Sequence, residues 1–84
     1  MNEAQPLLCA AANAEVPAYL VLCQKAYTVT APVNDGWYAE KDGMRFWAES
    51  LIELLGLVSM HEARGNNWTA ADQEIDDFLA KYNR

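Results

Sequence analysis

The side chains best suited to nucleophilic chemistry are two cysteines, Cys9 and Cys23, and a single histidine, His61. A thiolate paired with an imidazole base can attack a carbonyl carbon, provided that the fold brings the two groups together. Neither cysteine follows a glycine-flanked turn or an evident helix start, which are settings that lower the pKa of a thiol. We therefore expect both cysteines to be reduced and buried, and His61 to lie on a helix surface.

Acid–base and metal chemistry would need carboxylates or thiolates at defined spacings. General acid–base catalysis requires two carboxyl groups that lie in a cleft and have different environments. The acidic pairs of this chain lie on segments that are expected to be solvent-exposed. The acids near the C-terminus lack the glycine and the twelve-residue spacing of a calcium loop, and two cysteines make no zinc pattern. The four glycines are scattered and form no phosphate-binding loop. The sequence predicts no catalytic residue, no metal site, no cofactor and no enzymatic activity.

The charge balance narrows the class of partner. Twelve acids against six bases give a net charge of −6, and residues 35–84 hold ten of these acids and five of the bases. A nucleic-acid-binding protein usually carries a basic stripe, and an anionic membrane surface would repel this chain. We therefore expect neither partner, and a basic protein surface suits the acids better. Met1-Asn2-Glu3 lacks the positive charge that opens a signal peptide, and no apolar run is long enough to span a bilayer. We therefore expect a cytoplasmic protein.

The first third of the chain predicts two helices and one strand within a single compact domain over residues 1–84. Residues 2–13 have a capping Asn2 and a run of leucine and alanine, which favours a helix. The run over residues 16–23 is apolar enough for a buried strand or a helix, and periodicity alone does not separate the two. Pro17 is typical of a helix start, so a helix over residues 17–26 is favoured. The β-rich residues 27–30 predict a strand.

The middle of the chain predicts a β-hairpin, because Asp42-Gly43 separates two runs of alternating residues, 37–41 and 44–48. A two-residue turn at this place pairs Glu40 with Arg45 and Tyr38 with Trp47. Since strand side chains alternate between two faces, one face should belong to the core and the other should be half aromatic and half charged. The core face consists of Trp37, Ala39, Met44, Phe46 and Ala48, and the opposite face of Tyr38, Glu40, Arg45 and Trp47.

Two helices complete the expected fold. Ser50 and Glu53 form a capping box, and the helix should run to Arg64 and stop at Gly65. Its buried stripe consists of Leu51, Leu54, Leu55 and Val58, widened by Ile52 and Leu57, and Gly56 suggests close packing against another backbone. Thr69 should cap the last helix, whose apolar face consists of Ala71, Ile75, Phe78, Leu79 and Tyr82. The predicted fold is α+β, with a three-stranded antiparallel meander packed with N-terminal helices and two C-terminal helices.

Two surfaces are candidates for binding a partner. The first is the hairpin face with Tyr38, Glu40, Arg45 and Trp47, since Trp, Tyr and Arg are enriched at binding hot spots; the alternative is that an N-terminal helix covers this face as a second core layer. The second is the last helix, which places four carboxylates within two turns and would meet basic residues on a partner; the favoured alternative is that these acids only cap the helix and keep the protein soluble. These carboxylates belong to Asp72, Glu74, Asp76 and Asp77.

Three segments resemble the small single-domain immunity proteins of bacterial toxin systems and are similar to small phage-encoded inhibitors of host defence. They are EVPAYLVLCQKAYTV, GWYAEKDGMRFWAES and ELLGLVSMHEARGNNWTAADQEIDDFLAKY. The resemblance rests on size, acidity and aromatic content, and no functional residue is carried over from it. It implies inhibition by stoichiometric binding to a protein with a basic surface. Two alternatives remain, a nucleic-acid mimic that occupies a DNA- or RNA-binding protein, and a homodimer or other homo-oligomeric structural subunit.

Overall fold

The computed structural model describes residues 8, 13–31 and 35–82. In chain order its elements are α1 (Glu15–Gln24), β1 (Thr28–Thr30), β2 (Trp37–Lys41), β3 (Met44–Ala48), α2 (Leu51–Arg64), the 3-10 turn η1 (Gly65–Asn67) and α3 (Asp72–Tyr82). The three strands form one antiparallel sheet in the order β1-β2-β3. The α+β fold class is therefore confirmed. The helix expected over residues 2–13 falls almost entirely outside the described residues.

The ambiguous stretch after residue 15 is a helix, as favoured, and it begins two residues before Pro17. Pro17 is thus the third residue of α1, where a backbone N–H would have no partner within the helix in any case. The start of α1 also stabilises the start of α2, because the Glu15 carboxylate accepts hydrogen bonds from the backbone N–H groups of Leu51 at 2.8 Å and Ile52 at 3.1 Å. The two helices are therefore joined at their N-termini by one side chain.

The hairpin has the expected register, with Glu40 opposite Arg45 and Tyr38 opposite Trp47. Asp42 and Gly43 both have positive φ, +52° and +83°, which is the backbone of the two-residue turn whose twist matches that of paired strands. The residues of the inner face are buried at Ala39, Phe46 and Ala48. Met44, expected in the core, is 40% exposed because it lies beside the turn, at the end of the sheet.

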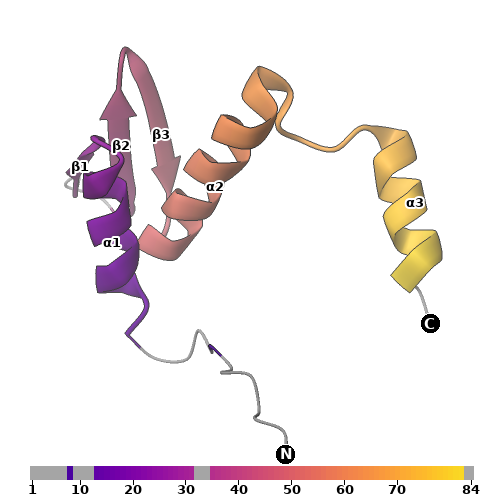
Figure 1. Cartoon of the computed structure of the whole chain (residues 1–84), viewed down its shortest axis with the longest axis horizontal. Helices are drawn as coiled ribbons and strands as arrows, with labels where there is room; N and C mark the ends of the chain where they lie inside the picture. Colours follow the sequence, from indigo (N-terminus) through magenta and orange to yellow (C-terminus); the bar gives the residue numbers. More distant parts are fainter. Residues whose placement is uncertain (1–7, 9–12, 32–34, 83–84) are drawn as a thin grey trace, which may run out of the picture.

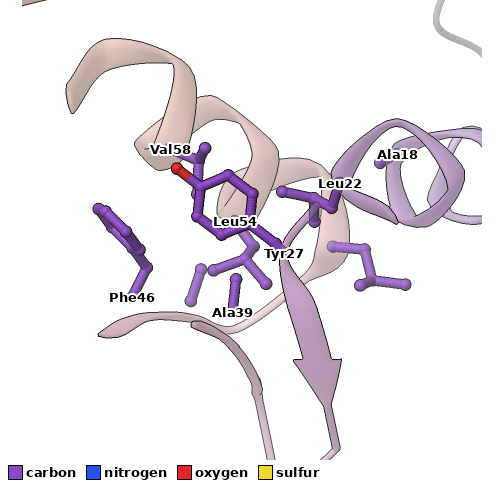
Figure 2. Close-up of a cluster of buried hydrophobic side chains, with 9 residues drawn as sticks. Ala18, Leu22, Tyr27, Ala39, Phe46, Leu54 and Val58 are labelled. Carbon is purple, nitrogen blue, oxygen red and sulfur yellow. The ribbon is translucent and has the colours of Figure 1, made fainter. Parts of the chain in front are cut away.

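Both α1 and α2 pack against the inner face of the sheet (Figure 1), and the core lies between these layers. Leu22 from α1 and Leu54 and Val58 from α2 are fully buried. They lie around Tyr27 and Ala39 in Figure 2. Each such side chain contributes about 1.5–3 kcal/mol by its removal from water. These contacts hold the helices on one side of the sheet and leave the other side uncovered by any described helix.

Helix α2 begins and ends as expected: the Ser50 hydroxyl accepts from the Glu53 N–H at 3.1 Å, and Gly65 follows the last helical residue. Two expectations about its middle are wrong. Ile52 is 46% exposed, because the helix turns its Leu51, Leu54 and Val58 side to the core. Gly56 does not pack closely against another backbone, since nothing lies within 4 Å of where its Cβ would be.

The start of α3 differs from the expectation. The helix begins at Asp72, and the Glu74 carboxylate accepts a hydrogen bond from the Ala71 N–H at 2.8 Å. Glu74 thus reaches back to the residue before the helix, as the acid of a capping box does. Thr69, the expected cap, lies two residues before the cap position, Ala71. Figure 1 shows α3 on the far side of α2 from the sheet, and it makes no extensive contact with any other described helix or strand.

Two glycine substitutions should change stability in opposite directions. Gly56→Ala should raise the free energy of unfolding by about 1 kcal/mol, because alanine favours the helix and meets open space there. Gly36→Ala should lower it by more than about 1 kcal/mol, because φ is +115° and the new Cβ would lie 2.3 Å from the Trp47 ring nitrogen. Urea denaturation followed by circular dichroism measures both, and a destabilising Gly56→Ala would contradict the packing described for α2.

Candidate functional site

The described residues contain one notable cavity, of about 350 Å³, at the tip of the hairpin. It is lined by Tyr27, Lys41, Asp42, Met44, Phe46, His61 and Glu62. No sequence pattern groups these residues, because they come from the residue before β1, from the hairpin around its tip and from the second half of α2. Only the observed packing of α2 against β3 brings them together. The volume is at the lower end of the range for small-molecule sites.

Four of the polar side chains around this cavity, Tyr27, Lys41, His61 and Glu62, already have partners. The Lys41 ammonium donates to the Lys25 carbonyl oxygen at 2.9 Å. The Glu62 carboxylate accepts from Lys25 Nζ at 2.8 Å and from the Tyr27 hydroxyl at 3.1 Å. His61 Nε2 is 2.9 Å from Asn66 Oδ1, and its ring stands edge-on to Phe46. Ligand sites usually hold a few convergent polar groups that await a partner, so this cluster reads as a network that joins α1, the sheet and α2.

The network shifts two pKa values. The hydrogen bond from Lys25 lowers the pKa of Glu62, with a smaller contribution from the Tyr27 hydroxyl. Burial raises the pKa of Tyr27, and the neighbouring Glu62 carboxylate raises it further. At neutral pH this arrangement favours an ionised Glu62 beside a neutral Tyr27. These shifts support a structural role, since both groups keep their ordinary charge at neutral pH.

The cysteine expectation is wrong for Cys23, which carries an exposed free thiol. One step along a helix turns the side chain by about 100°, so Cys23 points away from the core that its neighbour Leu22 enters. It shares the outer side of α1 with three other exposed residues, Val16, Tyr19 and Leu20. A hydrogen bond to Cys23 raises the pKa of Tyr19. Cys23 does not line the cavity that contains His61. Cys9 lies outside the described residues.

The hairpin residues singled out from the sequence lie together on the outer face of the sheet. The Arg45 guanidinium stacks over the Tyr38 ring at 4.4 Å from its centroid, and the Trp47 ring packs on Gly36 while remaining 45% exposed. The register places Thr28 and Thr30 on the same face, opposite Glu40 and Tyr38. No described helix covers this face, and the helix expected over residues 2–13, which is the other candidate for covering it, falls almost entirely outside the described residues.

The acidic residues singled out from the sequence all lie on α3, which is remote from that sheet face. Glu74 forms a salt bridge with Arg64 at 2.9 Å, and the two hydrogen bonds it accepts, from Ala71 and Arg64, lower its pKa. Asp77 accepts from Gln73 Nε2 at 2.8 Å. The structure therefore places the eight predicted residues on two separate surfaces. Among the four acids, Glu74 and Asp77 have partners within the chain, whereas Asp72 and Asp76 form no salt bridge with a described residue.

The apolar side of α3 is the feature whose exposure the sequence did not predict. Ile75, Phe78, Leu79 and Tyr82 are 44% to 60% exposed, and the Phe78 and Tyr82 rings contact each other with centroids 5.1 Å apart. In a small domain such a stripe is normally buried against the core. Here the body of the protein buries its core with α1, α2 and the sheet alone.

Comparison of the chain with protein-family models, with curated proteins and with solved structures found no match. Among the described residues, no helix has the length and apolar character needed to cross a membrane. The same residues contain no cluster of three or more His, Cys, Asp or Glu side chains that could hold a metal ion. The surfaces of α3 and of the sheet are therefore the candidate functional sites.

The Glu62 network gives a pH-dependent prediction. Because the pKa of Glu62 is lowered from its ordinary 4.5 in the folded state, its stabilisation is fully present above that value and is lost as the pH falls through the folded pKa. Wild type should therefore melt at a higher temperature than Glu62→Gln near neutral pH, and the difference should shrink in acid. Thermal unfolding followed by circular dichroism across this range measures it. Glu40→Gln, on the outer sheet face, is the control, and a difference that persists unchanged in acid would contradict the network.

Proposed function

We propose that this chain is a small protein-binding module that acts by stoichiometric binding, as an inhibitor or immunity protein for a partner protein. The observation that carries the proposal is α3, a helix with four large apolar side chains in water and no extensive contact with the rest of the described fold. Exposed apolar patches of this kind mark interaction sites in monomeric proteins. An amphipathic helix commonly binds by laying its apolar side into a groove of its partner.

Two further observations support binding without catalysis. Tyr27, Lys41 and Glu62, which line the cavity at the hairpin tip, are hydrogen-bonded within the protein. The net charge of −6 suits a partner with a basic surface, where it would speed encounter more than it would add affinity. The proposal places this binding in the cytoplasm, where the exposed Cys23 thiol would remain reduced.

The outer face of the sheet is a second surface for the same function. Trp47 and the stacked Tyr38 and Arg45 are of the residue types that dominate binding energy. They are, however, partly covered by their own neighbours: Arg45 lies on Tyr38, and Trp47 lies on Gly36. The stripe on α3 has more apolar surface to bury, so α3 is the leading surface and the sheet face is secondary.

Substitution of Phe78 tests the proposal. Phe78→Ser should abolish capture of the partner and leave the melting temperature unchanged, because Phe78 is 60% exposed and contributes nothing to the core. Ala80→Ser, on the opposite side of α3, should bind as wild type does. Affinity capture with tagged full-length chain and thermal unfolding are the measurements, and one equivalent of wild type should inhibit the captured protein.

Other outcomes identify the alternatives. Loss of binding in Trp47→Ala but not in Phe78→Ser would move the site to the sheet. Competition by DNA for the captured protein would favour a nucleic-acid mimic. A mass that doubles with concentration in light scattering would favour a homodimer. If neither Phe78→Ser nor Trp47→Ala weakens capture, the proposed binding surfaces are wrong.

A further inference from the structure

The two edges of the apolar stripe on α3 differ in charge. Residues three or four apart are neighbours on a helix surface, so Asp72 and Asp76 border the stripe beside Ile75 and Leu79. Glu74 and Lys81 border it on the other side, beside Phe78. Asp77 is three or four residues from Gln73, Ala80 and Lys81 but from none of the four large apolar residues, so it belongs to the back of the helix.

The carboxylates on these edges also differ in their partners. Glu74 is held by Arg64 and by the Ala71 N–H, so its charge is compensated within the chain. Lys81 adds a positive charge on the same side. Asp72 and Asp76 have no salt bridge within the part of the chain that the structure describes. One edge of the stripe is therefore strongly negative and the other is close to neutral.

This asymmetry decides between two occupants of the stripe. In a two-fold antiparallel pairing of two α3 helices, equivalent edges lie on the same side, so the Asp72 and Asp76 carboxylates of both copies would share one edge. Like charges brought together in an interface disfavour the association. A different protein with Lys or Arg beside an apolar groove would neutralise the same edge. Charge complementarity thus favours a heterologous partner over an antiparallel pair of copies.

We propose that α3 inserts Ile75, Phe78, Leu79 and Tyr82 into an apolar groove of another protein, whose rim carries Lys or Arg on the side that faces Asp72 and Asp76. This inference rests on the proposed function and adds the chemistry and the orientation of the partner. It also assigns different roles to two adjacent acids: Asp76 contacts the basic rim, whereas Asp77 faces solvent and binds Gln73.

The test uses the full chain with p-benzoylphenylalanine in place of Phe78, photolysed in the cells that express it. The crosslinked protein is identified by mass spectrometry and purified, and its affinity for wild type, Asp76→Lys and Asp77→Lys is measured by calorimetry. Both substitutions change the net charge by the same amount at neighbouring positions. Asp76→Lys should weaken binding by about tenfold or more, because it sets like charges against each other at the rim. Asp77→Lys should stay within about twofold of wild type, as exposed surface charges usually do.

Capture of a protein does not by itself support the inference; the difference between the two variants does. Equal weakening by Asp76→Lys and Asp77→Lys would overturn the oriented rim and leave the proposed binding function standing. A crosslink to a second copy of this chain alone would overturn both the heterologous partner and the proposed function. Absence of any crosslink would likewise remove α3 as the binding element. Circular dichroism of each variant confirms that α3 and the core remain folded.

Discussion

The tight turn at Asp42-Gly43 is the constraint on which the rest of the molecule depends. Because its two positive φ angles fix the pairing of β2 with β3, they also fix which side of the sheet every strand residue faces. Ala39, Phe46 and Ala48 meet α1 and α2 on one side, whereas Tyr38, Arg45 and Trp47 face water on the other. A shift of one residue would exchange these sets and leave Leu22, Leu54 and Val58 without an apolar surface to cover. The core face and the outer face of the sheet thus follow from one local geometry.

The parts of the fold that local chemistry determines could be predicted from the sequence. The hairpin register follows from two turn residues, and the limits of α2 follow from Ser50, Glu53 and Gly65. Expectations failed where the sequence offers two local choices or where tertiary packing decides. Thr69 and Glu74 are both able to cap the last helix, and it is the Glu74 side chain that reaches the Ala71 N–H. Gly56 gives no sign in the sequence of whether its surroundings are crowded or empty.

The candidate binding surfaces also combine features that the local sequence predicts with features that only the tertiary structure decides. The alternation of side chains along each strand predicts that Tyr38 and Trp47 share one face. Whether a helix covers that face depends on the path of the chain after each strand, which the alternation does not determine. The apolar side of α3 was evident from its spacing, yet amphipathic helices normally bury such a side, and only the three-dimensional arrangement shows that α2 and α1 leave it no place on the core. The contrast between the compensated Glu74 and the acids without a salt bridge, Asp72 and Asp76, likewise needed the Arg64 contact.

The separation of α3 from the core has an evolutionary consequence. Most residues of a small domain are restrained twice, by folding and by function, so that a change that improves one often harms the other. In α3 the restraint from folding is nearly absent, because the described core is formed without any residue of this helix. Under the proposed binding function, its side chains would be free to vary one at a time as the partner changes. A lineage in conflict with a rapidly diversifying opponent would gain from such a helix, because new specificities could arise on an unaltered scaffold.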